Sequence, residues 1–350
     1  MTSGFLFFLC KRIITMFIVL FSVLVLTISL LGPTMDDVIK NTVRSNVIDS
    51  VSNQKIEFKD LTERQRYIDQ QISLQIKNLG LEEPWYSPKR FLNTLFKVMI
   101  LDLGKSSFFV SDSGSSSVKD IMIEKIPKTI LLFTTSTLVI VMIGVLLGIF
   151  LANQAESKLD KANSIFAVFS NSIPVWWFGM IMILIFAFSL DIFPARSTPL
   201  TPPDDPFYIF DLLYHMILPF ITMVILGFGS VAYFVRSIAS GILNEDFIKA
   251  KFTIGIPKRK ILYSSVLKNI SPPIVTMLAL SLSGSWTGAF LIETVFDWPG
   301  MGKLAIDALG LMDVPIIIGF TYVSALVYLI TVFFLDVLYA YLDPRVKLNE

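Results

Sequence analysis

The side chains that most often carry catalysis or hold metal ions are scarce in this sequence. It contains one histidine, His215, and one cysteine, Cys10, so it can form neither a His-Glu-x-x-His motif nor a Cys/His zinc site. A Ser-His catalytic pair would have to use His215, and no neighbouring residue suggests such a pair. We therefore predict no catalytic residue, no metal site and no bound cofactor.

Two short stretches resemble phosphate-binding loops, but each lacks a glycine that such a loop needs. The Gly-Lys-Ser at 104–106 has Met99 in place of the first glycine of the Gly-x4-Gly-Lys-Ser motif, and the Gly-Lys at 302–303 has Asp297 there. Because the backbone of such a loop must wrap a phosphate group, we expect neither stretch to bind a nucleotide. Any ATP used with this chain must be hydrolysed on another one.

The composition is that of a membrane protein. Apolar residues make up 54% of the 350 residues and charged residues only 16%, with a mean hydropathy of +0.69. Six apolar runs reach the ~20 residues that cross ~30 Å of hydrocarbon, and backbone groups in lipid must be paired within a helix. The predicted spans are 13–31, 127–151, 164–190, 214–235, 273–292 and 315–341. The predicted fold class is an all-α membrane protein with six transmembrane helices.

Basic residues are unevenly distributed between the short loops that join these spans. With the N-terminus inside, the inner segments hold Lys11, Arg12, Lys158, Lys161, Arg236, Lys249, Lys251, Lys258, Arg259, Lys260, Lys268, Arg345 and Lys347. The opposite short loops hold only Arg196 and Lys303. Because lysine and arginine are retained on the cytoplasmic side, both termini are predicted to be cytoplasmic.

Residues 33–125 form the one large segment expected outside the cell, a helical insertion between the first two spans. Apolar residues at helical spacing predict an amphipathic helix over 57–79, and a second helix is predicted at Phe91–Leu101. The apolar positions of the first helix are Leu61, Ile68, Ile72, Ile76 and Leu79. Two roles fit this region equally, a spacer and a docking surface.

A polar, basic segment at about 236–270 interrupts the apolar sequence on the predicted inner side. A simple turn would need only a few residues, so this segment indicates a surface for a soluble partner. Phe247, Ile248 and Phe252 are apolar where water would otherwise cover them, and we predict that they anchor that partner. We predict a short helix near Asn244–Thr253, after which Gly255 allows a backbone turn and Pro257 prevents the helix from continuing. A purely lipid-binding loop would explain the lysines here but not the phenylalanines.

Small residues mark two of the spans. Gly144 and Gly148 form a Gly-x-x-x-Gly pair, which favours close helix packing. The fifth span is unusually small and hydroxylated, which suits either a passage for a polar solute or tight packing. As translocation-path residues we predict Ser281, Ser283, Ser285, Thr287 and, directly after the span, Glu293.

Several motifs occur in a fixed order along the chain. They are 101–106 (LDLGKS), 126–129 (IPKT), 246–276, 288–302 (GAFLIETVFDWPGMG), 313–315 (DVP), 335–339 (LDVLY) and 342–345 (LDPR). Together they resemble the permease subunits of the oligopeptide/dipeptide/nickel class of ABC importers. The sequence departs from that family before Gly255, where alternating alanine and basic residues are usual, and at Gly32-Pro33, where the first span lacks a Pro-Gly-Asp-Pro exit.

The resemblance implies a type I ABC importer permease in the cell membrane of a prokaryote, forming half of a translocation pathway. Implied partners are a second similar permease, two ABC ATPase subunits, an external substrate-binding protein and the lipid bilayer, with no nucleic acid. The implied domains are 1–32, with the first span; 33–125, outside the cell; and 126–350, a five-helix core with a coupling loop at about 236–270. The implied ATPase-coupling residues are Phe247, Ile248, Lys249, Ala250, Phe252, Gly255 and Pro257.

The cargo is left open by the sequence. Peptides are the leading prediction, with oligosaccharides or nickel as alternatives within the same type of importer. An ATP-independent secondary carrier is a further alternative, and it would be expected to show intramembrane charges or inverted repeats, neither of which is apparent here.

Overall fold

The computed structural model describes residues 2–53, 60–285 and 290–342, and the regular elements in these ranges are all helical. The chain forms two compact units, Met1–Glu124 with Ala305–Leu326 and Lys125–Leu304 with Val327–Glu350. Among the described residues, five helices are long and apolar enough to cross a membrane, or six if one bent pair is counted as a single span. The all-helical membrane architecture predicted from the sequence is therefore confirmed.

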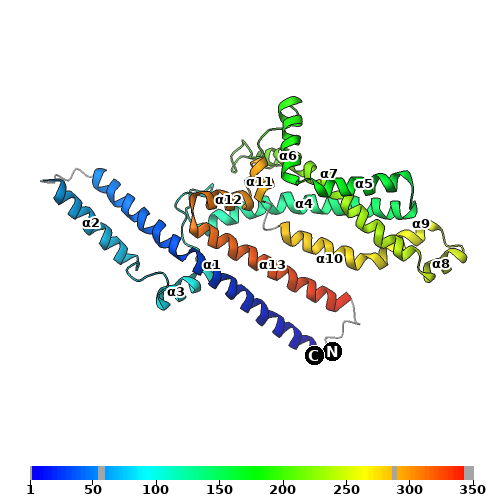
Figure 1. Cartoon of the computed structure of the whole chain (residues 1–350), viewed down its shortest axis with the longest axis horizontal. Helices are drawn as coiled ribbons and strands as arrows, with labels where there is room; N and C mark the ends of the chain where they lie inside the picture. The colour runs from blue at the N-terminus through cyan, green and yellow to red at the C-terminus, as the bar shows by residue number, and fades with distance from the viewer. Residues whose placement is uncertain (1, 54–59, 286–289, 343–350) are drawn as a thin grey trace. The chain divides into compact units, whose positions relative to one another are not determined.

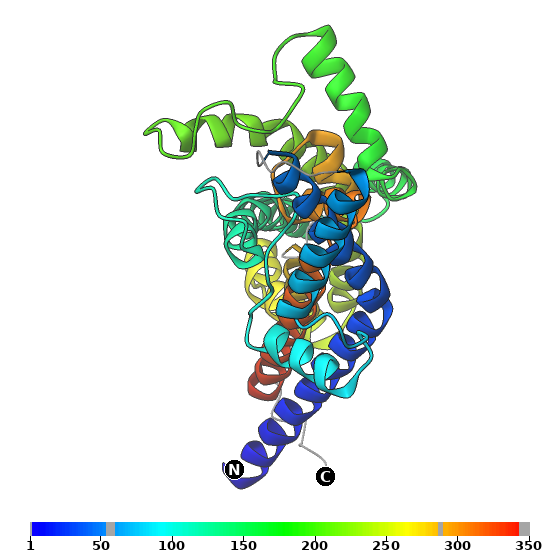
Figure 2. The same cartoon turned by 90° about the vertical axis from the view of Figure 1, so that its left-hand side faces the viewer.

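The first unit begins with α1 (Thr2–Asn53), which is much longer than the predicted span at 13–31. Its second half packs along α2 (Leu61–Asn78), as both views show (Figures 1 and 2). The contact is made by Val43, Val47 and Val51 against Ile68. A four-residue spacing places these valines on one face of the helix. α1 continues without a break through Pro33 to reach them.

Within the described residues the predicted helix over 57–79 is confirmed as α2, although Leu61 at its start and Leu79 at its C-cap are exposed; residues 57–59 lie outside the described residues. The predicted helix at Phe91–Leu101 is confirmed as α3 (Pro88–Met99). The first unit also contains the first turns of α4 (Val118–Asn153) and the beginning of α13 (Val314–Leu342). Asp313 caps the start of α13 and accepts a hydrogen bond of 2.6 Å from Ser106 Oγ, which joins two of the motifs identified in the sequence.

The second unit is built around α4 and α7 (Tyr208–Leu243), with α5 (Lys158–Ser172) lying beside α7 (Figure 1). A Cβ at Gly144 would lie 2.5 Å from Val231 Cγ1, and one at Gly148 would lie 2.7 Å from the carbonyl oxygen of Ala232. The two glycines therefore allow α4 and α7 to pack closely, as the Gly-x-x-x-Gly spacing predicted.

The predicted continuous span at 164–190 is wrong, because the chain bends by 94° between α5 and α6 (Val175–Ile183). A residue before proline avoids the helical conformation, and Ile173 is accordingly extended before Pro174. A π-helical segment, η1 (Leu184–Ser189), continues α6.

The fifth span begins earlier than predicted, and residues 286–289 of the predicted span lie outside the described residues. A short α8 (Asp246–Thr253) is followed by α9 (Lys258–Lys260), the π-helical η2 (Ile261–Val266) and α10 (Leu267–Ser285). The apolar helix runs from Lys258 to Leu282, straight through Pro272 and Pro273. Ser271 Oγ donates 2.8 Å to the Lys268 carbonyl, which the missing N–H of Pro272 would otherwise leave without its helical donor. Two short helices, α11 (Phe290–Phe296) and α12 (Met301–Leu311), precede α13.

Candidate functional site

The strongest candidate site is α8, the short helix in the polar segment between the long helices α7 and α10. Its C-terminal end has a left-handed glycine, because Gly255 adopts φ +79°. Gly255 N–H donates to the Phe252 carbonyl and Ile256 N–H to the Lys251 carbonyl, which is the hydrogen-bond pattern of a Schellman cap. Pro257 follows in an extended conformation and prevents α8 from continuing into α9. The turn predicted at Gly255 is thus confirmed.

One side chain holds α8 onto the second unit. Ile248 is fully buried in an apolar cluster that draws residues from α4, α7, η2 and α10. The other members of the cluster are Val141, Ile149, Ala152, Val235, Ala239, Ile261, Leu262, Val266, Ile270 and Ile274. The prediction that Ile248 is exposed is therefore wrong. A helix that lies on a protein surface must bury one face, and Ile248 occupies that face.

A polar contact strengthens the same attachment. Lys251 lies one turn after Ile248, and its Nζ donates 2.7 Å to Ser265 Oγ on η2. The same ammonium group lies 5.7 Å from the centre of the Phe247 ring, within range of a cation–π interaction. Lys251 is thus engaged within the chain, whereas Lys249 is exposed and pairs only loosely, at 3.3 Å, with the exposed Asp246.

The opposite side of α8 is open. Ala250 follows Ile248 by two residues and so points about 200° away from it around the helix, and it is exposed. Phe247 and Phe252 lie on either side of Ile248 around the helix, at the edges of the buried face, and remain 42% and 39% exposed. The accessible surface of α8 therefore consists of Ala250, opposite Ile248, and two half-exposed aromatic rings at the edges of the buried face, an arrangement that suits contact with another protein.

Glu293, predicted as a path residue, lies in the protein interior. It is fully buried, and its carboxyl group accepts hydrogen bonds of 2.9 Å from Thr129 Oγ1 and 2.9 Å from the Lys303 N–H. Thr129 Oγ1 in turn accepts 2.7 Å from the Met301 N–H. A Cβ at Gly300 would lie 2.5 Å from both Glu293 Oε2 and Thr129 Oγ1, so this packing requires a glycine there. The carboxyl group joins α4 to the segment after α11.

Glu293 lies outside the candidate spans, and its environment changes its titration. Burial raises the pKa of the Glu293 carboxyl group to about 7, although the hydrogen bonds from Lys303, Thr129 and Gly302 act in the opposite direction. Removal of the carboxylate from water has the larger effect. The side chain therefore changes its charge near neutral pH.

Of the other predicted path residues, Ser281 is exposed on α10. The side chains of Ser283 and Ser285, and all of Thr287, lie outside the described residues. Within the described ranges no three His, Cys, Asp or Glu residues are grouped so that they could hold a metal ion.

One charged pair was not predicted from the sequence. Arg236, on α7, donates from Nε to Asp160 Oδ1 at 2.8 Å and from Nη2 to Asp160 Oδ2. Asp160 is only 3% exposed and also accepts 2.9 Å from the Glu156 N–H at the start of α5. From the sequence, Arg236 was identified only as one of the basic residues of the inner segments, because a partner 76 residues away gives no local signal.

Comparison with known proteins assigns the chain to a family. Residues 144–348 match the family described as "Binding-protein-dependent transport system inner membrane component". The chain belongs to this family. Its members are the membrane subunits of ATP-driven importers, so the chain is a permease subunit and ATP is hydrolysed on a partner. The importer permease predicted from the sequence is confirmed.

Three relatives indicate the branch of the family. The chain is 29% identical over 272 residues to the oligopeptide transport system permease protein AppB of Bacillus subtilis, covering 78% of this chain and 84% of that protein. It is 32% identical to the probable D,D-dipeptide transport system permease protein DdpB of Escherichia coli K12, covering 77% and 82%. It is 30% identical to the dipeptide transport system permease protein DppB of Bacillus subtilis, covering 75% and 80%.

Proposed function

We propose that this permease imports di- or oligopeptides and that α8 transmits the force of ATP hydrolysis to its membrane helices. Relatives that carry peptide transport in their names support the choice of cargo. The proposed assembly contains a second, similar permease, two ATPase subunits and an external substrate-binding protein.

The proposed topology has six spans with both termini in the cytoplasm of a prokaryotic cell, the bent α5–α6 pair forming the third span. The distribution of lysine and arginine supports it, because the basic residues of α8 and α9 then lie on the inner side. Residues 33–125 lie outside in this topology, and the coupling loop at about 236–270 lies inside. Residues 126–350 form the five-helix core.

The observation that carries the coupling role is the two-sided character of α8. Its Ile248 side is buried among four other elements, while Phe247, Ala250 and Phe252 remain accessible. A partner that moves the accessible side must move the buried side with it, because packed apolar contacts do not deform continuously. α4, α7 and α10 would then shift together and change access to the pathway.

The direct test is Phe247→Asp in the complete importer, reconstituted with its ATPase subunits and binding protein. The new carboxylate can pair with the Lys251 ammonium nearby, so the permease should still fold while its apolar contact with the ATPase is lost. We expect ATPase subunits to co-purify poorly and ATP-dependent uptake of labelled peptide to fall at least tenfold. Phe247→Leu, which keeps an apolar side chain, is the matched control and should retain uptake.

Two outcomes would contradict the proposal in different ways. If Phe247→Asp retained both co-purification and uptake, α8 would not be the coupling element. If the unmodified importer hydrolysed ATP normally but took up no peptide, the coupling role would stand and the cargo would be wrong.

A further inference from the structure

A second surface of unusual character lies on α3, in the first unit. Leu92, Phe96 and Ile100 follow one another at four-residue spacing along this helix and its cap, and they are 59%, 62% and 59% exposed. Leu95 and Val98 on another face are buried. An exposed row of three large apolar side chains is unfavourable in water and indicates a surface that a membrane or a protein covers.

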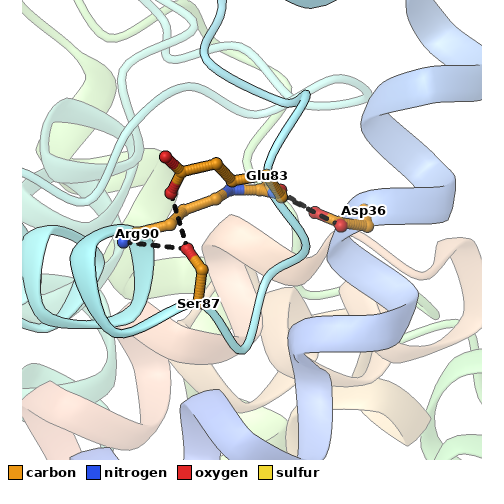
Figure 3. A network of polar contacts seen from close by, with 4 residues as sticks. All are labelled: Asp36, Glu83, Ser87 and Arg90. Carbon is orange, nitrogen blue, oxygen red and sulfur yellow. Dashed lines mark hydrogen bonds and ion pairs between the residues drawn. The ribbon is translucent and has the colours of Figure 1, made fainter.

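The N-terminal end of α3 is fixed where the apolar part of α1 ends. Trp85, shortly before α3, packs so closely on Gly32 of α1 that a Cβ there would lie 2.3 Å from its ring. Arg90 pairs with Asp36, one turn further along α1, and donates 2.8 Å to the Glu83 carbonyl (Figure 3). A tryptophan at the end of an apolar run is typical of the boundary between lipid and water.

The C-terminal end of α3 is fixed to a second candidate span. Tyr322 Oη donates 3.2 Å to the Met99 carbonyl oxygen. Tyr322 follows the start of α13 at Val314 by eight residues, or about 12 Å along the helix. Both ends of α3 are therefore attached to membrane helices of its own unit, at or below the level where those helices meet water.

Basic residues lie beside the apolar row. Lys89, Asn93 and Lys97 also recur at four-residue spacing and are exposed. Together with acidic and apolar side chains they line a cavity of about 970 Å³ between α1, α3 and the start of α13. A helix with an apolar row next to a lysine row is the pattern of helices that lie flat at the boundary between headgroups and acyl chains.

We propose that α3 is an interfacial helix embedded in the bilayer, with Leu92, Phe96 and Ile100 among the acyl chains and Lys89 and Lys97 on lipid phosphates. The occupant of this surface is thus the phospholipid bilayer, continuous with the lipid around the exposed Leu26 and Leu30 of α1. The assignment of α3 to the outer leaflet rests on the proposed topology, whereas the depth of α3 in the membrane does not depend on that topology. Through its bonds to α1 and α13, α3 holds the first unit at a fixed height in the membrane.

Spin labels can measure this depth directly. In a Cys10→Ser background, Leu92→Cys, Phe96→Cys and Ile100→Cys are each labelled in the importer complex in vesicles of phosphatidylcholine and phosphatidylglycerol. Gln75→Cys on α2, whose side chain is exposed, is the control. We expect labels on α3 to collide readily with oxygen and rarely with a water-soluble nickel chelate, and the Gln75 label to show the reverse.

Every other pattern at the three α3 positions would overturn the proposal. Frequent collisions with the chelate would place the row in water. Rare collisions with both reagents would show that a protein covers it, such as the second permease or the binding protein. Because the three positions are labelled separately, a single variant that fails to assemble leaves two readouts.

Two further measurements separate the lysine contact and the leaflet from the depth. The thermal midpoint of the wild-type complex should be higher with phosphatidylglycerol present than in phosphatidylcholine alone, and Lys89→Gln/Lys97→Gln should abolish that difference. An equal difference in both proteins would contradict the lysine contact.

In intact cells an impermeant maleimide should label Ser113→Cys in the Cys10→Ser background. Labelling only after membrane disruption would refute the proposed topology and leave the depth measurement valid.

Discussion

The buried carboxyl group of Glu293 predicts a specific dependence of stability on pH. Its pKa rises from 4.5 to about 7 on folding, which corresponds to roughly 3 kcal/mol of preference for the neutral form in the folded state. The folded state binds this proton more tightly than the unfolded state does. The stabilisation from this group is therefore complete below about pH 4.5 and is lost as the pH rises through about 7.

Glu293→Gln removes the titration and keeps the shape of the side chain. The amide oxygen can still accept from the Lys303 N–H, and the amide nitrogen can donate to Thr129 Oγ1. We expect the thermal midpoint of the wild-type complex to fall by several degrees more than that of the variant between pH 5 and pH 9. The comparison between the two proteins cancels the contributions of all other titrating groups that the substitution leaves unchanged.

The assay is thermal unfolding in lipid nanodiscs, followed by intrinsic tryptophan emission at a series of pH values. A difference between wild type and variant that did not change with pH would refute the reasoning. The hydrogen bonds from Thr129 and from the backbone N–H groups would then outweigh burial, and the carboxylate would remain charged throughout.

Two further predictions concern the packing of the second unit. Asp160→Asn should lower the stability of the complex by about 3 kcal/mol. This is the lower end of the cost of breaking a buried ion pair, because the Arg236 side chain is 25% exposed. A thermal midpoint equal to that of wild type would contradict this prediction. Gly148→Ala should cost about 1–3 kcal/mol, because the new methyl group would lie 2.7 Å from the Ala232 carbonyl oxygen. Gly241→Ala on α7 is its control, because a Cβ there would meet no atom within 4 Å beyond the adjacent backbone of its own helix, and it should stabilise by up to about 1 kcal/mol. Equal effects of the two alanines would show that α4 and α7 do not pack as described.

The sequence predicted the membrane helices well where apolar length decides the outcome, and less well where the chain bends or continues. The extension of α1 to Asn53 was missed although Val43, Val47 and Val51 carry the signal, because the predicted helix was ended at residue 31 with the apolar run. The bend before Pro174 also has a local cause that the apolar run concealed.

The site was predicted in position but not in detail. The position of α8 and of its terminating glycine was predicted correctly, because a glycine followed two residues later by a proline is a local signal for the end of a helix. It did not reveal which face of α8 is buried, since that depends on the cluster around Ile248 contributed by distant helices. For the same reason it did not show that Thr129, 164 residues away, binds Glu293.

The central claim is that the open side of α8 contacts the ATPase, and a photo-crosslinking amino acid at position 250 tests it most directly. Ala250 is exposed and lies opposite the buried Ile248, so a probe there should not disturb the attachment of α8. In cells that produce the whole importer, illumination should join the permease to an ATPase subunit. A probe at position 250 that yielded no ATPase adduct in the assembled complex, or that joined the permease to the external binding protein, would contradict the account.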